Sequence, residues 1–170
     1  MELNIFFQVK ELQFLDLLGN NLLVSKGNIN STDHKYSYLL LSSCNLCEFP
    51  DFQKAQNELD RLDLSNNKIE GKIPKWFCKV GKGTLQYLNL SFNLLSGFEQ
   101  PLKVLPWKFI DYLDLRSNTL QGSLPIPPLS TSYFFASKNN LTGKIPRMIC
   151  NMNSLQVLDI SNNQLNGHIP

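Results

Sequence analysis

A sixteen-residue pattern occurs twice in the chain with every fixed position filled by the same kind of residue. It reads L-x-x-L-x-L-x-x-N-x-I-x-G-x-I-P from Leu59 to Pro74, and it returns, with two exchanges between Leu and Ile, from Leu155 to Pro170. In its L-x-L part the two leucines point to the same side of a short strand, so they enter a core while the residue between them faces solvent. One such unit cannot bury its apolar edge alone. The pattern therefore predicts a solenoid of stacked units whose strands form a parallel sheet.

The asparagine of the pattern recurs where each strand is expected to end. Its amide carries two donors and an acceptor, so a column of these side chains can satisfy backbone groups that the turns leave without partners. Successive positions lie 24, 23, 26, 25, 21 and 24 residues apart, within the roughly 20 to 29 residues typical of a leucine-rich repeat. The expected turn column consists of Asn20, Cys44, Asn67, Asn93, Asn118, Asn139 and Asn163.

We expect a single array of about seven leucine-rich repeats over residues 1–170, with no separate domain or linker. Residues 1–11 are expected to form the outer segment of an incomplete repeat. The fourth repeat replaces the usual Ile-Pro by residues 98–101, so its lateral edge should be irregular. Stable solenoids carry polar caps, and neither end shows one, which indicates an internal piece of a longer protein. Strands are expected near residues 12–17, 36–41, 59–64, 85–90, 110–115, 131–136 and 155–160.

Longer stretches of the chain resemble one family. The ending x-x-L-x-G-x-I-P is similar to the plant type of leucine-rich repeat, and four stretches look like consecutive repeats from the ectodomain of plant disease-resistance receptor-like proteins. The resemblance covers essentially the whole chain. These stretches are Ser43–Pro50, Leu62–Trp76, Leu88–Pro101 and Leu105–Trp107.

The resemblance implies a membrane-anchored receptor without a kinase domain, on the extracellular face of the plasma membrane. Such a receptor senses a microbial or endogenous protein or peptide ligand, in defence or developmental signalling, and signals through a co-receptor kinase. We expect no secretory signal in the chain itself, because Glu2 and Glu11 flank an apolar run of only Ile5–Phe7. We also expect no anchor, because no run approaches the roughly 20 apolar residues of a membrane span. Two alternatives stay open: a secreted inhibitor of cell-wall-degrading enzymes on the same scaffold, and a truncated, inactive product.

Composition argues against several other functions. A net charge of +2 with scattered lysines leaves no nucleic-acid footprint. The lysines between Lys72 and Lys82 are expected to form a solvated outer face, with contact to an acidic cell-wall polymer as the alternative. The repeat register places neither His34 nor His168 beside a nucleophile and a carboxylate, so we expect no catalysis and no cofactor.

The four cysteines are not expected to form disulfides or a metal site. Cys78 and Cys150 occupy equivalent places three repeats apart, on the order of 14 Å at the strand spacing of a sheet, whereas a disulfide needs Cα atoms within about 7 Å. Cys44 and Cys47 form a possible but strained pair, so free thiols are favoured there and their redox state stays open. Zinc would need further ligands close to this pair, and the histidines lie one and five repeats away.

Three N-x-S/T sequons are candidate glycosylation sites, at Asn30, Asn89 and Asn140. Asn140 follows a residue of the turn column and should face outward. Asn89 lies between Leu88 and Leu90, so it should point from the concave sheet. A glycan at Asn89 would block part of that surface, and an unmodified strand asparagine is the alternative.

The register also assigns the side chains of the concave face. One column of outward positions holds Phe14, Tyr38, Arg61, Tyr87, Tyr112, Tyr133 and Val157, and the next holds Asp16, Leu40, Asp63, Asn89, Asp114, Phe135 and Asp159. Tyrosine and arginine beside carboxylates favour protein binding, because large rigid side chains contribute contact area at low entropic cost. The alternative is that strands favour aromatics for cross-strand pairing alone. The candidate ligand-binding residues are Tyr87, Phe92, Tyr112, Asp114, Arg116, Tyr133 and Phe135.

Overall fold

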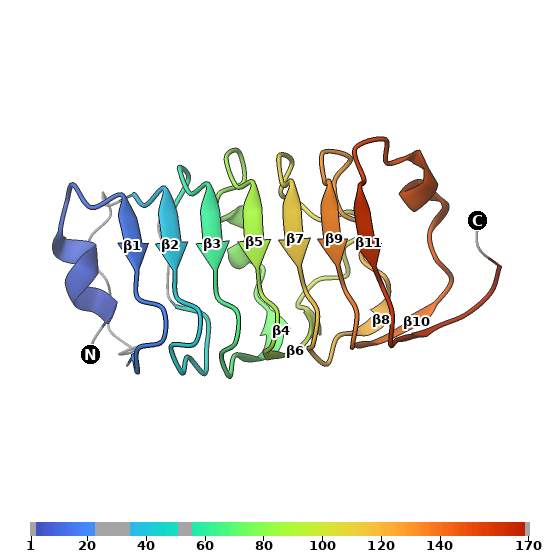
Figure 1. Ribbon diagram of the computed structural model, residues 1–170, viewed down its shortest axis with the longest axis horizontal. Coiled ribbons are helices and arrows are strands. Elements are labelled where there is room, and N and C mark those ends of the chain that lie inside the picture. Colours follow the sequence, from blue (N-terminus) through green and yellow to red (C-terminus); the bar gives the residue numbers. More distant parts are fainter. Residues whose placement is uncertain (1–2, 23–34, 51–55, 169–170) are drawn as a thin grey trace.

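The computed structural model describes residues 3–22, 35–50 and 56–168. Within them, a main sheet of seven short parallel strands runs along the long axis of the molecule in the order of the chain (Figure 1). This arrangement confirms the leucine-rich-repeat solenoid predicted from the sequence. The strands are β1 (Phe14–Asp16), β2 (Tyr38–Leu40), β3 (Arg61–Asp63), β5 (Tyr87–Asn89), β7 (Tyr112–Asp114), β9 (Tyr133–Phe135) and β11 (Val157–Asp159).

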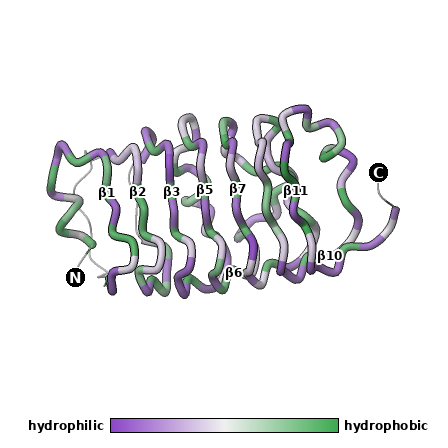
Figure 2. Tube along the Cα trace, viewed as in Figure 1, coloured by the Kyte–Doolittle hydropathy of each residue, from purple (hydrophilic) through white to green (hydrophobic). Residues whose placement is uncertain are grey.

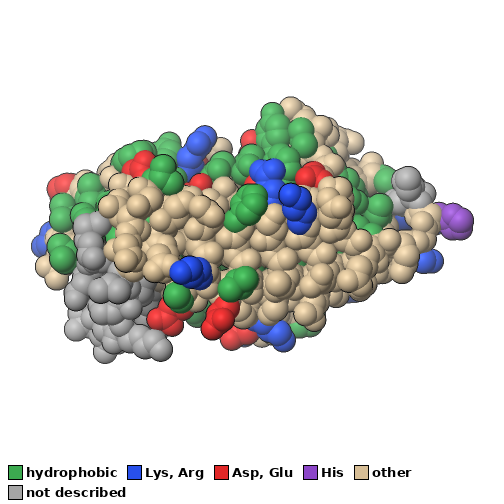
Figure 3. Space-filling model, turned by 60° about the horizontal axis from the view of Figure 1, so that its bottom comes forward, with side chains coloured by type: hydrophobic (Ala, Val, Ile, Leu, Met, Phe, Trp, Pro, Cys, Tyr) green, Lys and Arg blue, Asp and Glu red, His purple; other side chains and the backbone are tan. Residues whose placement is uncertain are grey.

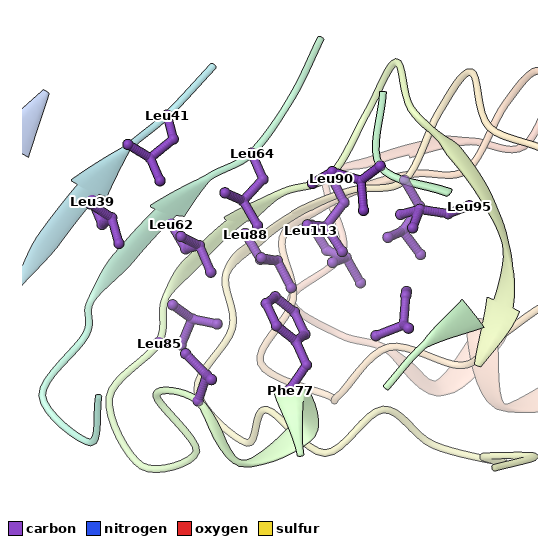
Figure 4. Packing of buried hydrophobic residues seen from close by; sticks show 14 of the residues in the cluster. Leu39, Leu41, Leu62, Leu64, Phe77, Leu85, Leu88, Leu90, Leu95 and Leu113 are labelled. Carbon is purple, nitrogen blue, oxygen red and sulfur yellow. The ribbon is translucent and has the colours of Figure 1, made fainter. Parts of the chain in front are cut away.

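The central residue of each strand points into the core, in register with its neighbours. Leu39, Leu62, Leu88 and Leu113 follow one another along the sheet and are fully buried, and Figure 4 shows their side chains pointing the same way. The leucines two positions later form a second buried row. Only the last strand differs, because Leu158 is 37% exposed. Hydrophobic and hydrophilic stretches consequently alternate along the turns of the solenoid (Figure 2).

Two smaller sheets lie on the lateral side, where each repeat leaves its turn. One pairs β4 (Glu70–Ile73) with β6 (Leu94–Phe98), with a register shift between Gly71 and Lys72. The other contains β8 (Gln121–Ser123), β10 (Asn140–Gly143) and β12 (Gln164–Leu165). The strand pairing on this lateral side is thus interrupted between β6 and β8. The interruption lies next to residues 98–101, where the sequence lacks the usual Ile-Pro.

The outer segments contain short 3-10 helices and aromatic packing. The helices are η1 (Leu3–Gln8), η2 (Phe77–Lys79) and η3 (Arg147–Asn151). Behind the middle of the sheet the Phe77 ring lies 4.7 Å from Phe49 and 6.0 Å from Trp107, and the Trp107 indole N–H donates to the Val80 carbonyl at 3.1 Å. These rings fill the space between the strands and the outer segments, and so they set the thickness of the central repeats.

The turn column runs through the core as a continuous chain of hydrogen bonds. The Nδ2 group of Asn118 donates to the carbonyl of Leu90 in the preceding repeat at 3.0 Å and to that of Leu115 in its own repeat at 3.1 Å, and its Oδ1 accepts from the Leu95 N–H at 3.0 Å. The same three contacts recur at Asn67, Asn93, Asn139 and Asn163.

Cys44 occupies the same column with different contacts. Its thiol donates to the Leu17 carbonyl at 3.0 Å, and the Leu22 N–H, which has no asparagine oxygen to reach, donates instead to the Cys44 carbonyl at 3.0 Å. Burial raises the pKa of the Cys44 thiol, and burial also raises that of Cys78. The four cysteines, which all lie within the described ranges, form no disulfide; Cys47 and Cys150 are exposed.

Candidate ligand-binding face

Aromatic rings from three neighbouring strands form a contiguous cluster on the outward face of the main sheet. Tyr87 of β5 and Tyr112 of β7 are paired in register, and their rings stack with centroids 4.5 Å apart and planes 10° apart. The Tyr112 ring also lies 5.5 Å from Phe135 and 6.2 Å from Tyr133, both on β9. The parallel register thus brings together residues 21 to 25 positions apart in the chain.

An ion pair between Asp114 and Arg116 lies beside the Phe135 ring of this cluster. Asp114 is only 1% exposed, and its Oδ2 accepts from the Arg116 Nε–H at 2.7 Å. The Arg116 guanidinium in turn lies over the Phe135 ring, 4.6 Å from its centroid. The guanidinium of Arg116 therefore does two things: it neutralises the buried Asp114 carboxylate, and it stacks on the Phe135 ring.

The electrostatic environment perturbs several groups here. Burial raises the pKa of the Asp114 carboxyl, and the hydrogen bonds from Arg116 oppose that rise. Burial, together with the nearby Asp114 charge, raises the pKa of Tyr112 to about 12. The hydroxyl of Tyr112 donates to Asp114 Oδ2 at 3.4 Å. At neutral pH the Tyr112 phenol is thus uncharged, beside the ion pair of Asp114 and Arg116.

Arg61 extends the cluster beyond the candidates chosen from the sequence. Its guanidinium lies 5.3 Å from the centroid of the Tyr87 ring, and the side chain is exposed. On the other side, the Tyr133 hydroxyl donates to Gln156 Oε1 at 3.1 Å. Arg61 falls in the same outward column as the tyrosines, so the register contained the signal, whereas the role of Gln156 depends on a contact between repeats.

Phe92 is set apart from the other candidates. It lies in the turn after β5 with a positive φ of 54° and is 51% exposed. Its backbone N–H donates to the Arg116 carbonyl at 3.0 Å, but no ring contact joins it to the tyrosines among the described residues. Phe92 therefore lies beside the cluster as a separate exposed ring. We define the aromatic cluster as Arg61, Tyr87, Tyr112, Asp114, Arg116, Tyr133 and Phe135.

The candidate glycosylation sites have different surroundings. Asn89 is half-buried in β5, where its Nδ2 donates to Asp63 Oδ2 at 3.4 Å and its Oδ1 accepts from the Ser91 hydroxyl at 2.7 Å. Asn140 begins β10 and is exposed. Asn30 lies outside the described residues. Modification of Asn89 would require its amide to leave these contacts, so Asn140 is the better proposed acceptor.

Charges of both signs are scattered over the face shown in Figure 3, without an extended area of one sign. Within the described ranges, no group of three or more metal-ligating side chains is close enough to hold a metal ion. None of the helices in those ranges is long and apolar enough to cross a membrane.

Comparison with known proteins agrees with the fold. The profile of the Leucine Rich Repeat family matches residues 58–80, 84–103 and 154–170. Among solved structures, a plant peptide hormone receptor, RGFR1 in complex with RGF2, aligns with a TM-score of 0.82 at 29% identity over 98% of this chain and 27% of its own. The Arabidopsis receptor kinase HAESA, in complex with the peptide hormone IDA and the co-receptor SERK1, aligns with a TM-score of 0.79 at 27% identity over 98% of this chain and 28% of its own.

The curated relatives are similar over the whole chain. Receptor-like protein 7 of Arabidopsis thaliana is 44% identical over 171 residues, and receptor-like protein 6 is 43% identical over 174 residues; each alignment covers 100% of this chain. The chain spans 17% of the length of either relative. By its repeats, its fold and these relatives, the chain belongs to the plant leucine-rich-repeat receptor-like proteins.

Proposed function

We propose that this chain is a non-catalytic recognition module of a plant cell-surface receptor, and that the aromatic cluster binds a protein or peptide ligand. The observation that carries the proposal is the continuous contact from Arg61 through the stacked Tyr87 and Tyr112 to Phe135 and Arg116. Tyrosine and arginine are enriched at the energetic centres of protein interfaces.

The cluster is ordered before a ligand arrives. Stacking fixes the Tyr87 and Tyr112 rings, and Asp114 and Phe135 fix the Arg116 side chain. A ligand would therefore lose little side-chain entropy at this surface when it binds, which is a main cost of association. Each tyrosine of the cluster is only partly buried, so the rings can contact a partner as well as each other. Arg61, the register partner of Tyr87, adds an exposed guanidinium beside the rings that a ligand can reach.

The two structural neighbours suggest the kind of partner. RGFR1 and HAESA were solved with peptide hormones, and HAESA also with the co-receptor SERK1. We propose the same classes of partner for this array within its full-length receptor: a peptide ligand on the main sheet and a co-receptor kinase, on the extracellular side of the membrane.

A peptide selection tests the proposal. Random twelve-residue peptides displayed on phage are selected on the purified chain, and the recovered peptides are measured against Tyr112→Ala and against Phe109→Ala. Phe109 is 50% exposed and lies outside the aromatic cluster, so it is the matched control for loss of a surface ring. Loss of a central interface aromatic costs about 2 kcal/mol or more, or about thirtyfold in affinity. We expect that loss for Tyr112→Ala only. Equal binding by both variants would show that the ligand surface lies elsewhere.

A further inference from the structure

Strands β6 and β8 separate over a short stretch that is bounded at each end by a backbone hydrogen bond. We call the gap between them the lateral opening. At one end the Thr119 N–H donates to the Leu95 carbonyl at 2.9 Å, and at the other the Leu105 N–H donates to the Ile126 carbonyl at 2.9 Å, beside an isolated parallel bridge from Val104 to Ile126. Between these contacts the β6 side has nine residue steps, from 95 to 104, and the β8 side seven, from 119 to 126. The longer side bows away, so the two strands separate.

A pocket of about 430 Å³ occupies this opening. Apolar side chains that line it include Phe98, Leu102 and Leu120, and polar ones include Gln121 and Ser123. Lys72 also lines it from β4; this side chain is exposed and makes no ion pair within the described ranges. Glu99 lines the pocket as well, and its Oε2 accepts from the Lys75 N–H at 2.7 Å. The pocket thus offers apolar contact and one charged side chain of each sign.

The backbone of β8 presents a free strand edge to the pocket. The Asn140 N–H donates to the Leu120 carbonyl at 2.9 Å, so the groups of Leu120 and Gly122 face β10. Because backbone groups alternate in direction along a strand, those of Gln121 and Ser123 face the opposite way, toward β6. In the part of the chain that the structure describes, β8 pairs only with β10. Two N–H and two C=O groups therefore line the opening without a strand partner.

The β6 side presents a similar edge. The Glu99 N–H donates to the Ile73 carbonyl of the β4 strand at 3.0 Å, so the groups of Phe98, one residue earlier, face the opening. Nothing obstructs close approach near the two glycines of the lining, because a Cβ atom built on Gly97 or Gly122 would meet no other atom within 4 Å. A ligand backbone can therefore come close to the strand edges.

We propose that this opening binds a short extended peptide segment of a partner protein, which adds to the free edge of β8. Main-chain hydrogen bonds to Gln121 and Ser123 would supply affinity for any extended segment, and the apolar pocket would take alternate side chains. Of the two charged lining residues, Lys72 would attract an acidic side chain of the segment and Glu99 a basic one. A saccharide has no series of N–H and C=O groups at strand spacing, so it would leave the edge of β8 unsatisfied. This site is separate from the aromatic cluster, which lies on the main sheet.

A defined probe tests the edge directly. The probe is the acetylated and amidated hexapeptide Thr-Val-Asp-Val-Thr-Val, and its control is the same peptide with N-methyl groups on the internal amides, which cannot pair with a strand. At millimolar peptide, we expect the probe to shift the NMR signals of the Gln121 and Ser123 amides and to slow their hydrogen exchange several-fold. Two lost hydrogen bonds of about 0.5–1.5 kcal/mol each correspond to a roughly fivefold to hundredfold weaker binding of the control.

A pair of variants locates the binding. Ser123→Trp places a large ring at the pocket, whereas Gln164→Trp places the same ring at the register-equivalent exposed position of β12, outside the pocket. We expect only Ser123→Trp to abolish the shifts. The peptide pair is measured on the unmodified protein, so the test does not depend on the folding of either variant. The proposal is wrong if the hexapeptide does not bind, if its N-methylated control binds equally, or if only a β-linked glucose pentasaccharide shifts these amides.

Discussion

Replacing Asn118 by alanine tests whether the turn column holds the repeats together. The substitution removes the Asn118 Oδ1 atom that accepts from the Leu95 N–H, and Leu95 is fully buried. An unpaired buried N–H costs about 1–3 kcal/mol. The carbonyls of Leu90 and Leu115 lose the Asn118 donor, but each keeps a second one, from Asn93 at 3.2 Å and Asn139 at 3.0 Å.

The lost Asn118 donors therefore add a smaller penalty, and the sum is about 2–4 kcal/mol of unfolding free energy. For a chain of this size each kcal/mol shifts the melting temperature by about 2–4 °C, so we expect a decrease of roughly 5–15 °C. The assay is a thermal melt followed by circular dichroism, with urea unfolding as a second measurement. Several probes should be compared, because repeat arrays can unfold in more than one step.

The matched control is Asn20→Ala, at the exposed first position of the same column. Its Nδ2 donates to the Leu17 carbonyl at 3.0 Å, and that carbonyl also accepts from the Cys44 thiol. We expect a change within about 0.5 kcal/mol, as for other exposed substitutions. If Asn118→Ala costs no more than Asn20→Ala, satisfaction of buried backbone groups is not what the column contributes.

Two further predictions concern the core and the aromatic cluster. Leu88→Asp should abolish the cooperative thermal melt, because it puts an unpaired charge at a fully buried position. The control Leu94→Asp, at a residue that is 51% exposed, should keep the transition. A retained transition in Leu88→Asp would refute the register of the main sheet. Since the pKa of Tyr112 is raised to about 12 in the folded chain, against about 10 when unfolded, its contribution to stability is complete below about pH 10 and is lost as the pH rises toward 12. In urea unfolding at about pH 9 and about pH 11.5, Tyr112→Phe should lose less stability than the unmodified chain, and an equal loss would contradict this reasoning.

Much of the architecture follows from the sequence because each repeat contacts only its neighbours. Once Leu62 and Leu64 are assigned to one face of a strand, the same spacing assigns Leu88, Leu113 and the outward column that contains Tyr87. Solenoid stability is close to a sum of such nearest-neighbour terms, so a periodic pattern carries nearly all the information that the fold needs.

The details of the sites depend on contacts that no periodic pattern specifies. The positions of Arg61 over Tyr87 and of Arg116 between Asp114 and Phe135 depend on side-chain conformation. The groups involved lie 19 to 26 residues apart, or two residues apart in the case of Asp114 and Arg116. The backbone carbonyl of Cys44 that replaces an asparagine oxygen is equally a consequence of local packing.

The lateral opening shows the same division. The missing Ile-Pro predicts an irregular edge. Only the three-dimensional path of the backbone shows that the segments after β6 and β8 separate and then pair again at Val104 and Ile126. Periodic sequence thus determines which residues enter the core and which face outward, because that choice repeats with the strand. The tertiary structure decides which outward groups meet and which strand edges stay free, because distances between repeats are absent from the pattern.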